Sequence, residues 1–263
     1  MNFGIRNKVA LVAAASRGLG YATAMELARE GAQVAVCGRD EQRIHRAAAE
    51  LSASTGGRIL PVVADVEKAQ DCEYFIAQAA ETLGSVDILV TNAGGPPAGF
   101  FEDIDDESWA LGFERTMMSA IRLIRAALPH MREKKWGRIV AITSISVKQP
   151  IPGLLLSNAL RPGVVGMAKS LADEVALDGI TINAVCPGWT ATERVDEILQ
   201  ARAESRGISK QEAAAEIEQS IPMRRMAKPE ELAAMVTFLC SARASYITGT
   251  TIQVDGGAFR GLM

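Results

Sequence analysis

Short apolar runs alternate with longer amphipathic stretches along this chain, and the alternation continues from residue 9 to residue 254. Seven of the runs are rich in Val, Ile and Ala and nearly continuous in apolar residues, which is the pattern of strands buried on both faces of a parallel sheet. The predicted strands cover residues 9–13, 33–37, 59–64, 88–91, 138–143, 181–185 and 251–254. The repeated alternation predicts an α/β fold.

The amphipathic stretches between these strands predict helices that cover the sheet. They span residues 20–30, 41–52, 68–82, 108–133, 164–177 and 229–241. No internal repeat, low-complexity tract or linker rich in Pro, Gly or Ser divides the sequence. Residues 1–263 are therefore interpreted as a single domain.

Residues 189–225 differ from the rest, because they are highly charged, rich in Ala and Glu, and inserted between two strand and helix units. In open α/β sheets, ligands bind beyond the carboxyl ends of the strands, where this insertion begins. The segment is therefore predicted to form a helical lid over a substrate. A pair of solvated surface helices is the alternative interpretation.

The amino-acid composition argues against some classes of binding partner. The net charge of -3 and the scattered Lys and Arg residues argue against a nucleic-acid partner. The sequence contains no apolar run of about 18 residues and no signal-peptide pattern at its start, so we expect no membrane span and a cytoplasmic protein.

The cysteines are well separated, at Cys37, Cys72, Cys186 and Cys240, and the chain has only two histidines. Neither a CxxC pair nor a set of zinc ligands is present. The cysteines are predicted to be free, buried thiols, and no metal site is expected.

Between the first predicted strand and the first helix, the chain reads Ala13-Ala14-Ala15-Ser16-Arg17-Gly18-Leu19-Gly20. Glycines at such a turn let the backbone approach a pyrophosphate, whose charge lies among the unpaired N–H groups of a helix N-terminus. A tight turn without a ligand uses the same residue types, so the loop by itself is consistent with both interpretations.

The end of the second strand is where a dinucleotide-binding fold places the residue that faces the adenine ribose. An acidic residue there would bind a 2′-hydroxyl, but the first charged residue is Arg39. Together with Arg17 it would bracket a 2′-phosphate, which favours NADP(H) over NAD(H). The alternative is that Arg39 is a solvated loop residue. Asp40 is interpreted as the N-cap of the next helix.

With these residues and several later motifs, the chain resembles the classical short-chain dehydrogenases/reductases over essentially its full length, close to the β-ketoacyl-acyl-carrier-protein reductases. The later motifs are Asp65-Val66, Asn92-Ala93-Gly94, Pro187-Gly188, Tyr246-Ile247-Thr248-Gly249 and Val254-Asp255-Gly256-Gly257. The resemblance implies a Rossmann fold with a doubly wound, seven-stranded parallel sheet in the order 3-2-1-4-5-6-7. It also implies a homotetramer.

The resemblance further implies which residues hold the cofactor. In that family the Asp-Val pair contacts adenine, the Asn-Ala-Gly turn packs against the adenosine ribose, and the Pro-Gly pair with the following threonines holds the nicotinamide. The implied cofactor-binding residues are Ala14, Ser16, Arg17, Gly18, Leu19, Gly20, Arg39, Asp65, Val66, Asn92, Ala93, Gly94, Arg161, Pro187, Gly188, Thr190 and Thr192.

The catalytic positions of the family match only in part. Members use a Tyr, a Lys four residues later, a Ser thirteen residues before the Tyr and an Asn in the preceding long helix. Ser144 keeps the serine, but the Tyr and Lys positions hold Ser157 and Arg161, and Thr116 stands where the Asn belongs. Ala14 also replaces the first glycine of the loop motif.

These replacements change the available chemistry. The hydroxyl of Ser157 is a poor acid, and Arg161 can supply positive charge but stays protonated. A helix that begins near Pro162 would leave both residues partly in a loop. Lys148 is a candidate proton donor, and an exposed loop lysine is its alternative interpretation.

Two functions follow from this partial match. The first is an NADP(H)-dependent oxidoreductase with a non-standard site built on Ser144, Ser157 and Arg161, which reduces a ketone or an acyl-thioester substrate of the 3-oxoacyl type. The second is a non-catalytic sensor or scaffold that binds a dinucleotide.

Overall fold

The core of the molecule is a seven-stranded parallel sheet in the order β3-β2-β1-β4-β5-β6-β7, as predicted. Residues 2–262 are described by the structure, which is a computed structural model. The strands are β1 (Val9–Val12), β2 (Gln33–Gly38), β3 (Ile59–Val63), β4 (Ile88–Thr91), β5 (Gly137–Ile142), β6 (Ile180–Pro187) and β7 (Thr251–Val254). From β1 the chain adds β2 and β3 on one side, and it then crosses over to add β4 to β7 on the other side. This change of side between β1 and β4 creates a crevice at their carboxyl ends.

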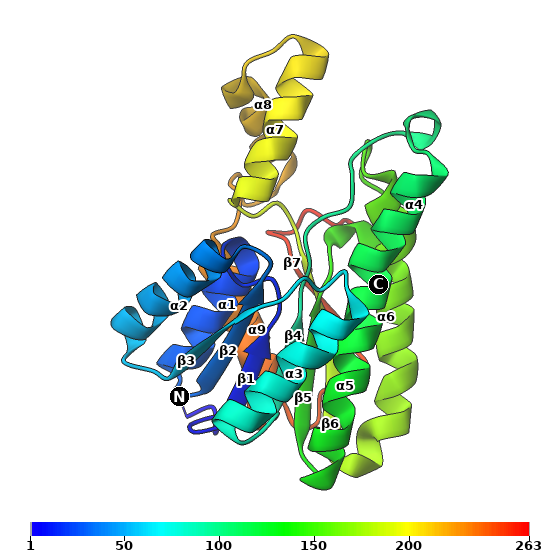
Figure 1. The fold of residues 1–263 in the computed structure, drawn as a ribbon. Coiled ribbons are helices and arrows are strands. Elements are labelled where there is room, and N and C mark those ends of the chain that lie inside the picture. Colours follow the sequence, from blue (N-terminus) through cyan, green and yellow to red (C-terminus); the bar gives the residue numbers. More distant parts are fainter. Residues whose placement is uncertain (1, 263) are drawn as a thin grey trace.

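Helices cover both faces of this sheet (Figure 1). One face is covered by α1 (Gly18–Arg29), α2 (Glu41–Thr55) and α9 (Pro229–Leu239), and the other by α3 (Ala69–Leu83), α5 (Ser119–Glu133) and α6 (Leu155–Val175). Each face has its own buried apolar cluster. The strands are apolar on both sides because both sides are covered.

The helix predicted over residues 108–133 is divided into segments. It consists of α4 (Asp106–Phe113), a π-helical turn at Glu114–Met118 and α5. Turns of the π type inside α-helices are rare and occur frequently at functional sites. Here the turn contains Thr116, the residue that the family resemblance aligns with a catalytic position.

The prediction that a helix begins near Pro162 is wrong, because α6 begins at Leu155 and contains that proline. Its first turn is held by tertiary contacts. Leu156 is fully buried, and the Asn158 side chain exchanges two hydrogen bonds with the backbone of Ile151, at 3.0 and 2.9 Å. These contacts anchor the turn before Pro162, and the helix continues through a residue that removes one backbone hydrogen bond. Ser157 and Arg161 therefore lie one helical turn apart on α6.

Residues 189–225 form two helices, α7 (Glu193–Arg206) and α8 (Lys210–Ser220), which project from one end of the molecule (Figure 1). They pack on each other through a small apolar cluster that is separate from the main core. Among residues 2–262, no helix has the length and apolar character needed to cross a membrane.

Candidate functional site

A cleft of about 480 Å³ opens at the carboxyl ends of the strands. It is lined by the segments that follow β1 to β6 and by the start of α7. Every residue that the sequence identified as catalytic or cofactor-binding lines this cleft, with the exception of Gly20. Residues up to 184 positions apart in the chain, from Ala14 to Ile198, thus meet in one place.

The loop after β1 adopts the tight turn that was expected. Gly18 has a positive φ of 61° and faces the cleft, and Ala14 has a φ of 48°, a conformation that favours glycine. Gly20 has a different role. A Cβ atom there would lie 2.6 Å from the carbonyl oxygen of Ala14 and 2.9 Å from the Cα atom of Ala15. Gly20 thus permits close packing of α1 on the loop and does not line the cleft.

The N-terminus of α1 carries backbone donors without capping groups. Its N-cap residue, Arg17, makes no capping side-chain hydrogen bond, and the first turn contains no acidic residue. By contrast, Asp40, Thr192 and Ser209 cap α2, α7 and α8 with their side chains. The donors at the start of α1 lie beside the cleft, where they suit an anion such as a pyrophosphate.

The predicted arginines, Arg17 and Arg39, both line the cleft. Arg39 follows β2, its side chain is 71% exposed, and its Nη1 lies 3.9 Å from a Glu67 carboxylate oxygen. The interpretation of Asp40 as an N-cap is confirmed, because its Oδ1 accepts a hydrogen bond from the Arg43 backbone at 2.9 Å. Its carboxylate is therefore engaged with the helix, which leaves a positively charged rim at the end of β2.

Hydrogen bonds hold the other predicted cofactor loops in place. The Asn92 side chain donates to the carbonyl oxygens of Ala13 and Ala14, at 3.3 and 3.2 Å, and so ties the end of β4 to the glycine loop. After β3, the Asp65 backbone donates to Asp71 at 2.8 Å, and the Asp65 carboxylate accepts from the Glu67 backbone at 3.2 Å. The loops are thus braced by the protein itself.

The three predicted catalytic residues come together from β5 and α6. Ser144 follows β5, and its hydroxyl accepts a hydrogen bond from the Ser146 backbone at 3.1 Å. Ser157 is 8% exposed, and Arg161 donates from Nη1 to the carbonyl oxygen of Thr143 at 2.8 Å. The guanidinium is therefore attached to the residue that directly precedes Ser144.

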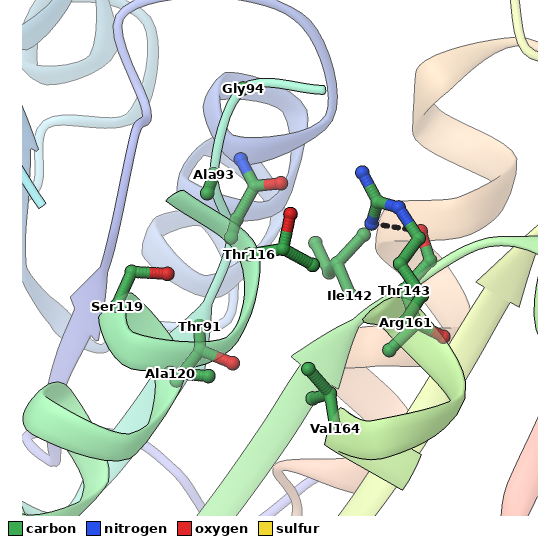
Figure 2. A pocket seen from close by; sticks show the side chains of 11 residues that line it. Thr91, Ala93, Gly94, Thr116, Ser119, Ala120, Ile142, Thr143, Arg161 and Val164 are labelled. Carbon is green, nitrogen blue, oxygen red and sulfur yellow. Dashed lines mark hydrogen bonds between the residues drawn. The ribbon is translucent and has the colours of Figure 1, made fainter. Parts of the chain in front are cut away.

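A small cavity of about 20 Å³ lies beside this group (Figure 2). Thr116 and Arg161 both line it, from the π-helical turn and from α6. The Thr116 Oγ1 and Arg161 Nε atoms are buried without a hydrogen-bond partner among the described residues. A cavity of this size has room for about one water molecule, which would bridge such polar groups.

The charge of Arg161 is poorly compensated. Burial and the like charge of Arg194 lower the pKa of Arg161 to about 10. The side chain therefore remains a cation at neutral pH, as predicted. Arg161 is partly buried, with its Nε fully buried, and the burial of a cation without a carboxylate partner is costly.

The candidate proton donor Lys148 and the tyrosines lie outside the cleft. Lys148 is partly buried but does not line it, and neither do any of the three tyrosines, Tyr21, Tyr74 and Tyr246. Of the apolar residues in the 189–225 segment, Trp189 and Ile198 line the cleft. Leu199 instead packs within the α7 and α8 cluster, and Met223 is exposed.

All four cysteines are buried and free, as predicted. Burial raises the pKa of Cys37 to about 12 and that of Cys72 to about 11. Within residues 2–262 there is no group of three or more His, Cys, Asp or Glu side chains arranged to hold a metal ion.

Sequence reasoning missed six charged residues that line the cleft, namely Arg43, Glu67, Arg115, Glu193, Arg194 and Glu197. Glu67 accepts a 2.6 Å hydrogen bond from Arg115, and Arg194 donates to the carbonyl oxygen of Pro96 at 2.9 Å. Arg43 was the easiest of them to find, because it lies one helical turn after Asp40, on the rim where Arg39 was already identified.

Comparison with known proteins agrees with this geometry. A family model described as enoyl-(acyl carrier protein) reductase matches residues 13–258. Dehydrogenase/reductase SDR family member 4 from Oryctolagus cuniculus is 36% identical over 255 residues, which cover 97% of this chain and 94% of the rabbit protein.

Two solved reductase structures are also similar. L-sorbose reductase from Gluconobacter frateurii, in complex with NADPH and L-sorbose, has a TM-score of 0.95 at 33% identity, and the match covers 100% of both chains. A variant of actinorhodin polyketide ketoreductase with NADPH has a TM-score of 0.91 at 34% identity, with 95% of this chain and 96% of that one covered. This chain therefore belongs to the short-chain dehydrogenase/reductase family.

Proposed function

We propose that this protein is an NADP(H)-dependent oxidoreductase that reduces a carbonyl group with a non-standard set of site residues. The observation that carries the proposal is that Ser144, Ser157 and Arg161 line the same cleft as the glycine loop and the Arg17 and Arg39 rim. The choice of NADP(H) is confirmed by the comparisons, since the similar reductase structures are NADPH complexes.

The residues present fit this cofactor. The uncapped N-terminus of α1 suits the pyrophosphate, and Arg17 and Arg39 suit a 2′-phosphate. We assign the loops at Asp65 and Asn92 to the adenosine half, and the loop at Pro187-Gly188 with Thr190 and Thr192 to the nicotinamide half. When bound, NADPH supplies the hydride that reduces a carbonyl carbon.

Residues of the protein then interact with the carbonyl oxygen of the substrate. The Ser144 hydroxyl donates a hydrogen bond to that oxygen, and Arg161 stabilises the negative charge that develops on it. Because neither Ser157 nor Arg161 gives up a proton readily at neutral pH, we assign the proton to a water molecule held in the cavity beside Thr116. Arg161 is thus an electrostatic group and not the proton donor.

We assign the 189–225 segment as a helical lid over this cleft. Its first helix contacts the glycine loop through ion pairs of Arg17 with Glu193 and Glu197, and it contacts the loop after β4 through Arg194. We further propose a single domain, a homotetramer and a cytoplasmic location, with no nucleic-acid or membrane partner. Light scattering coupled to size-exclusion chromatography tests the tetramer.

The test of function is NADPH oxidation, followed by absorbance, against a panel of ketones and 3-oxoacyl thioesters. We expect turnover by the wild type and a loss of about 10²-fold or more in Ser144→Ala. An absence of turnover with every substrate, despite NADPH binding, would refute the proposal.

The alternative function, a non-catalytic sensor or scaffold, is favoured by the replaced Tyr and Lys positions. The triple variant Thr116→Asn, Ser157→Tyr and Arg161→Lys distinguishes the two functions. Activity that appears only in the triple variant supports the sensor, whereas activity of the wild type that the triple variant loses supports the enzyme.

A further inference from the structure

Arg161 differs from the other arginines of the cleft in its charge partners. Six arginines line the cleft, and five of them have a carboxylate oxygen within 4.0 Å. The pairs are Arg17 with Glu193, Arg39 with Glu67, Arg43 with Asp40, Arg115 with Glu67 and Arg194 with Glu197. Arg161 has no such partner among the residues that the structure describes.

The unpaired charge lies deep in the cleft, at its reactive end. The Nε atom is buried and unpartnered, and Nη1 is held by the carbonyl oxygen of Thr143. Figure 2 shows the guanidinium beside Thr143, across the small cavity from Thr116. The nearby charge that acts on Arg161 most strongly is another cation, Arg194. This end of the cleft is therefore electropositive and selects for an anion.

The cofactor phosphates are not the counter-ion in this arrangement. We assigned them to the start of α1 and to the rim at Arg17 and Arg39, which follow β1 and β2. Arg161 instead lies on α6, packed against the end of β5 and next to Ser144. An anion that neutralises Arg161 must therefore enter with the substrate.

We propose, building on the function proposed above, that the substrate is a carbonyl compound with a free carboxylate close to the reacting carbonyl, and that Arg161 binds this carboxylate. A guanidinium suits a carboxylate because it donates charge-assisted hydrogen bonds. Because Arg161 is bonded to Thr143, the residue directly before Ser144, a carboxylate bound to Arg161 would lie near the reacting carbonyl, which favours a 2-oxo or 3-oxo acid. Arg161 then determines substrate specificity, and a neutral 3-oxoacyl thioester is the poorer substrate.

The test compares acids with their methyl esters in NADPH oxidation. We expect kcat/KM for 2-oxobutanoate and 3-oxobutanoate to exceed that for the methyl esters by about 10- to 100-fold in the wild type. Arg161→Gln should lose this preference. Arg43→Gln is the matched control, since it removes an equal charge from the cleft rim, and it should keep the ratio of acid to ester.

A second measurement separates this inference from the proposed function. The unreactive anion oxamate is titrated into the NADPH-loaded protein, and NADPH fluorescence reports binding. We expect Arg161→Gln to weaken oxamate binding about 10-fold or more, and Arg43→Gln to leave it unchanged.

Each outcome has a defined meaning. Turnover of esters or neutral ketones with no preference for acids would overturn the inference and leave the oxidoreductase intact. If no substrate is turned over, the proposed function fails, and oxamate binding still tests the anion site. Oxamate binding that depends on Arg161 supports the anion site. No binding, or equal binding by the wild type and Arg161→Gln, overturns the anion site.

Discussion

Replacement of Gly20 by Ala tests the packing of α1 on the glycine loop. The added methyl group would lie 2.6 Å from the Ala14 carbonyl oxygen, 2.9 Å from the Ala15 Cα atom and 3.0 Å from the Asn92 Nδ2 atom. Two of these neighbours are backbone atoms, so no side-chain rotation relieves the contact. The loop and the start of α1 must therefore move apart.

The size of the effect follows from two opposing contributions. Overpacking of a tight site costs about 1–3 kcal/mol, whereas Ala in place of Gly within a helix stabilises it by up to about 1 kcal/mol. We expect a net destabilisation of about 1–2 kcal/mol. Because the same displacement disturbs the donors at the N-terminus of α1, NADPH affinity should fall about 10-fold or more.

Urea unfolding and calorimetric titration with NADPH measure the two effects. Gly166→Ala is the matched control, because Gly166 lies in α6 and its added methyl group would meet no atom within 4 Å. The control should gain up to about 1 kcal/mol of stability and bind NADPH normally. If Gly20→Ala matches this control in both measurements, the reasoning is refuted.

Three further predictions concern the loop, the cofactor rim and the thiols. Ala14→Gly should raise the free energy of unfolding by up to about 1 kcal/mol, because it relieves the left-handed φ of 48°; a lower midpoint in urea unfolding would contradict this account. Arg39→Ala should weaken NADPH about 10-fold in calorimetry without changing NADH affinity, and equal affinity of the wild type for both cofactors would overturn the selection for NADP(H). With the pKa of Cys37 raised to about 12 and that of Cys72 to about 11, Ellman's reagent at pH 8 should modify no thiol of the native protein and all four after unfolding; fast reaction of a native thiol would argue against their burial.

Much of the fold was predictable from local pattern. A strand such as Val9–Val12 is apolar at every position because helices cover both faces of the sheet. The order of the strands cannot be read from such runs, since each buried strand has the same pattern, and it came from the family motifs. Helix boundaries were less predictable where tertiary contacts override propensity, as at Pro162, which α6 accommodates because Asn158 holds its first turn.

The candidate site was also predictable only in part. Residues in short motifs, such as Asn92 and Arg39, were found because their position follows a strand end. Ion pairs between distant segments were not predicted, because no spacing in the sequence indicates them. The contact of Arg17 with Glu193 joins positions far apart in the chain, and the isolation of Arg161 becomes visible only when every carboxylate around the cleft is located. The π-helical turn at Thr116 is likewise a product of packing.

The most direct test of the central claim is deuterium transfer from NADPH labelled at C4. The wild type is incubated with labelled NADPH and a carbonyl substrate, and the product is analysed by mass spectrometry. Hydride transfer at the proposed site predicts an alcohol that carries one deuterium, formed by the wild type and largely lost in Ser144→Ala. Absence of labelled alcohol with all substrates, in protein that binds NADPH tightly, would contradict it.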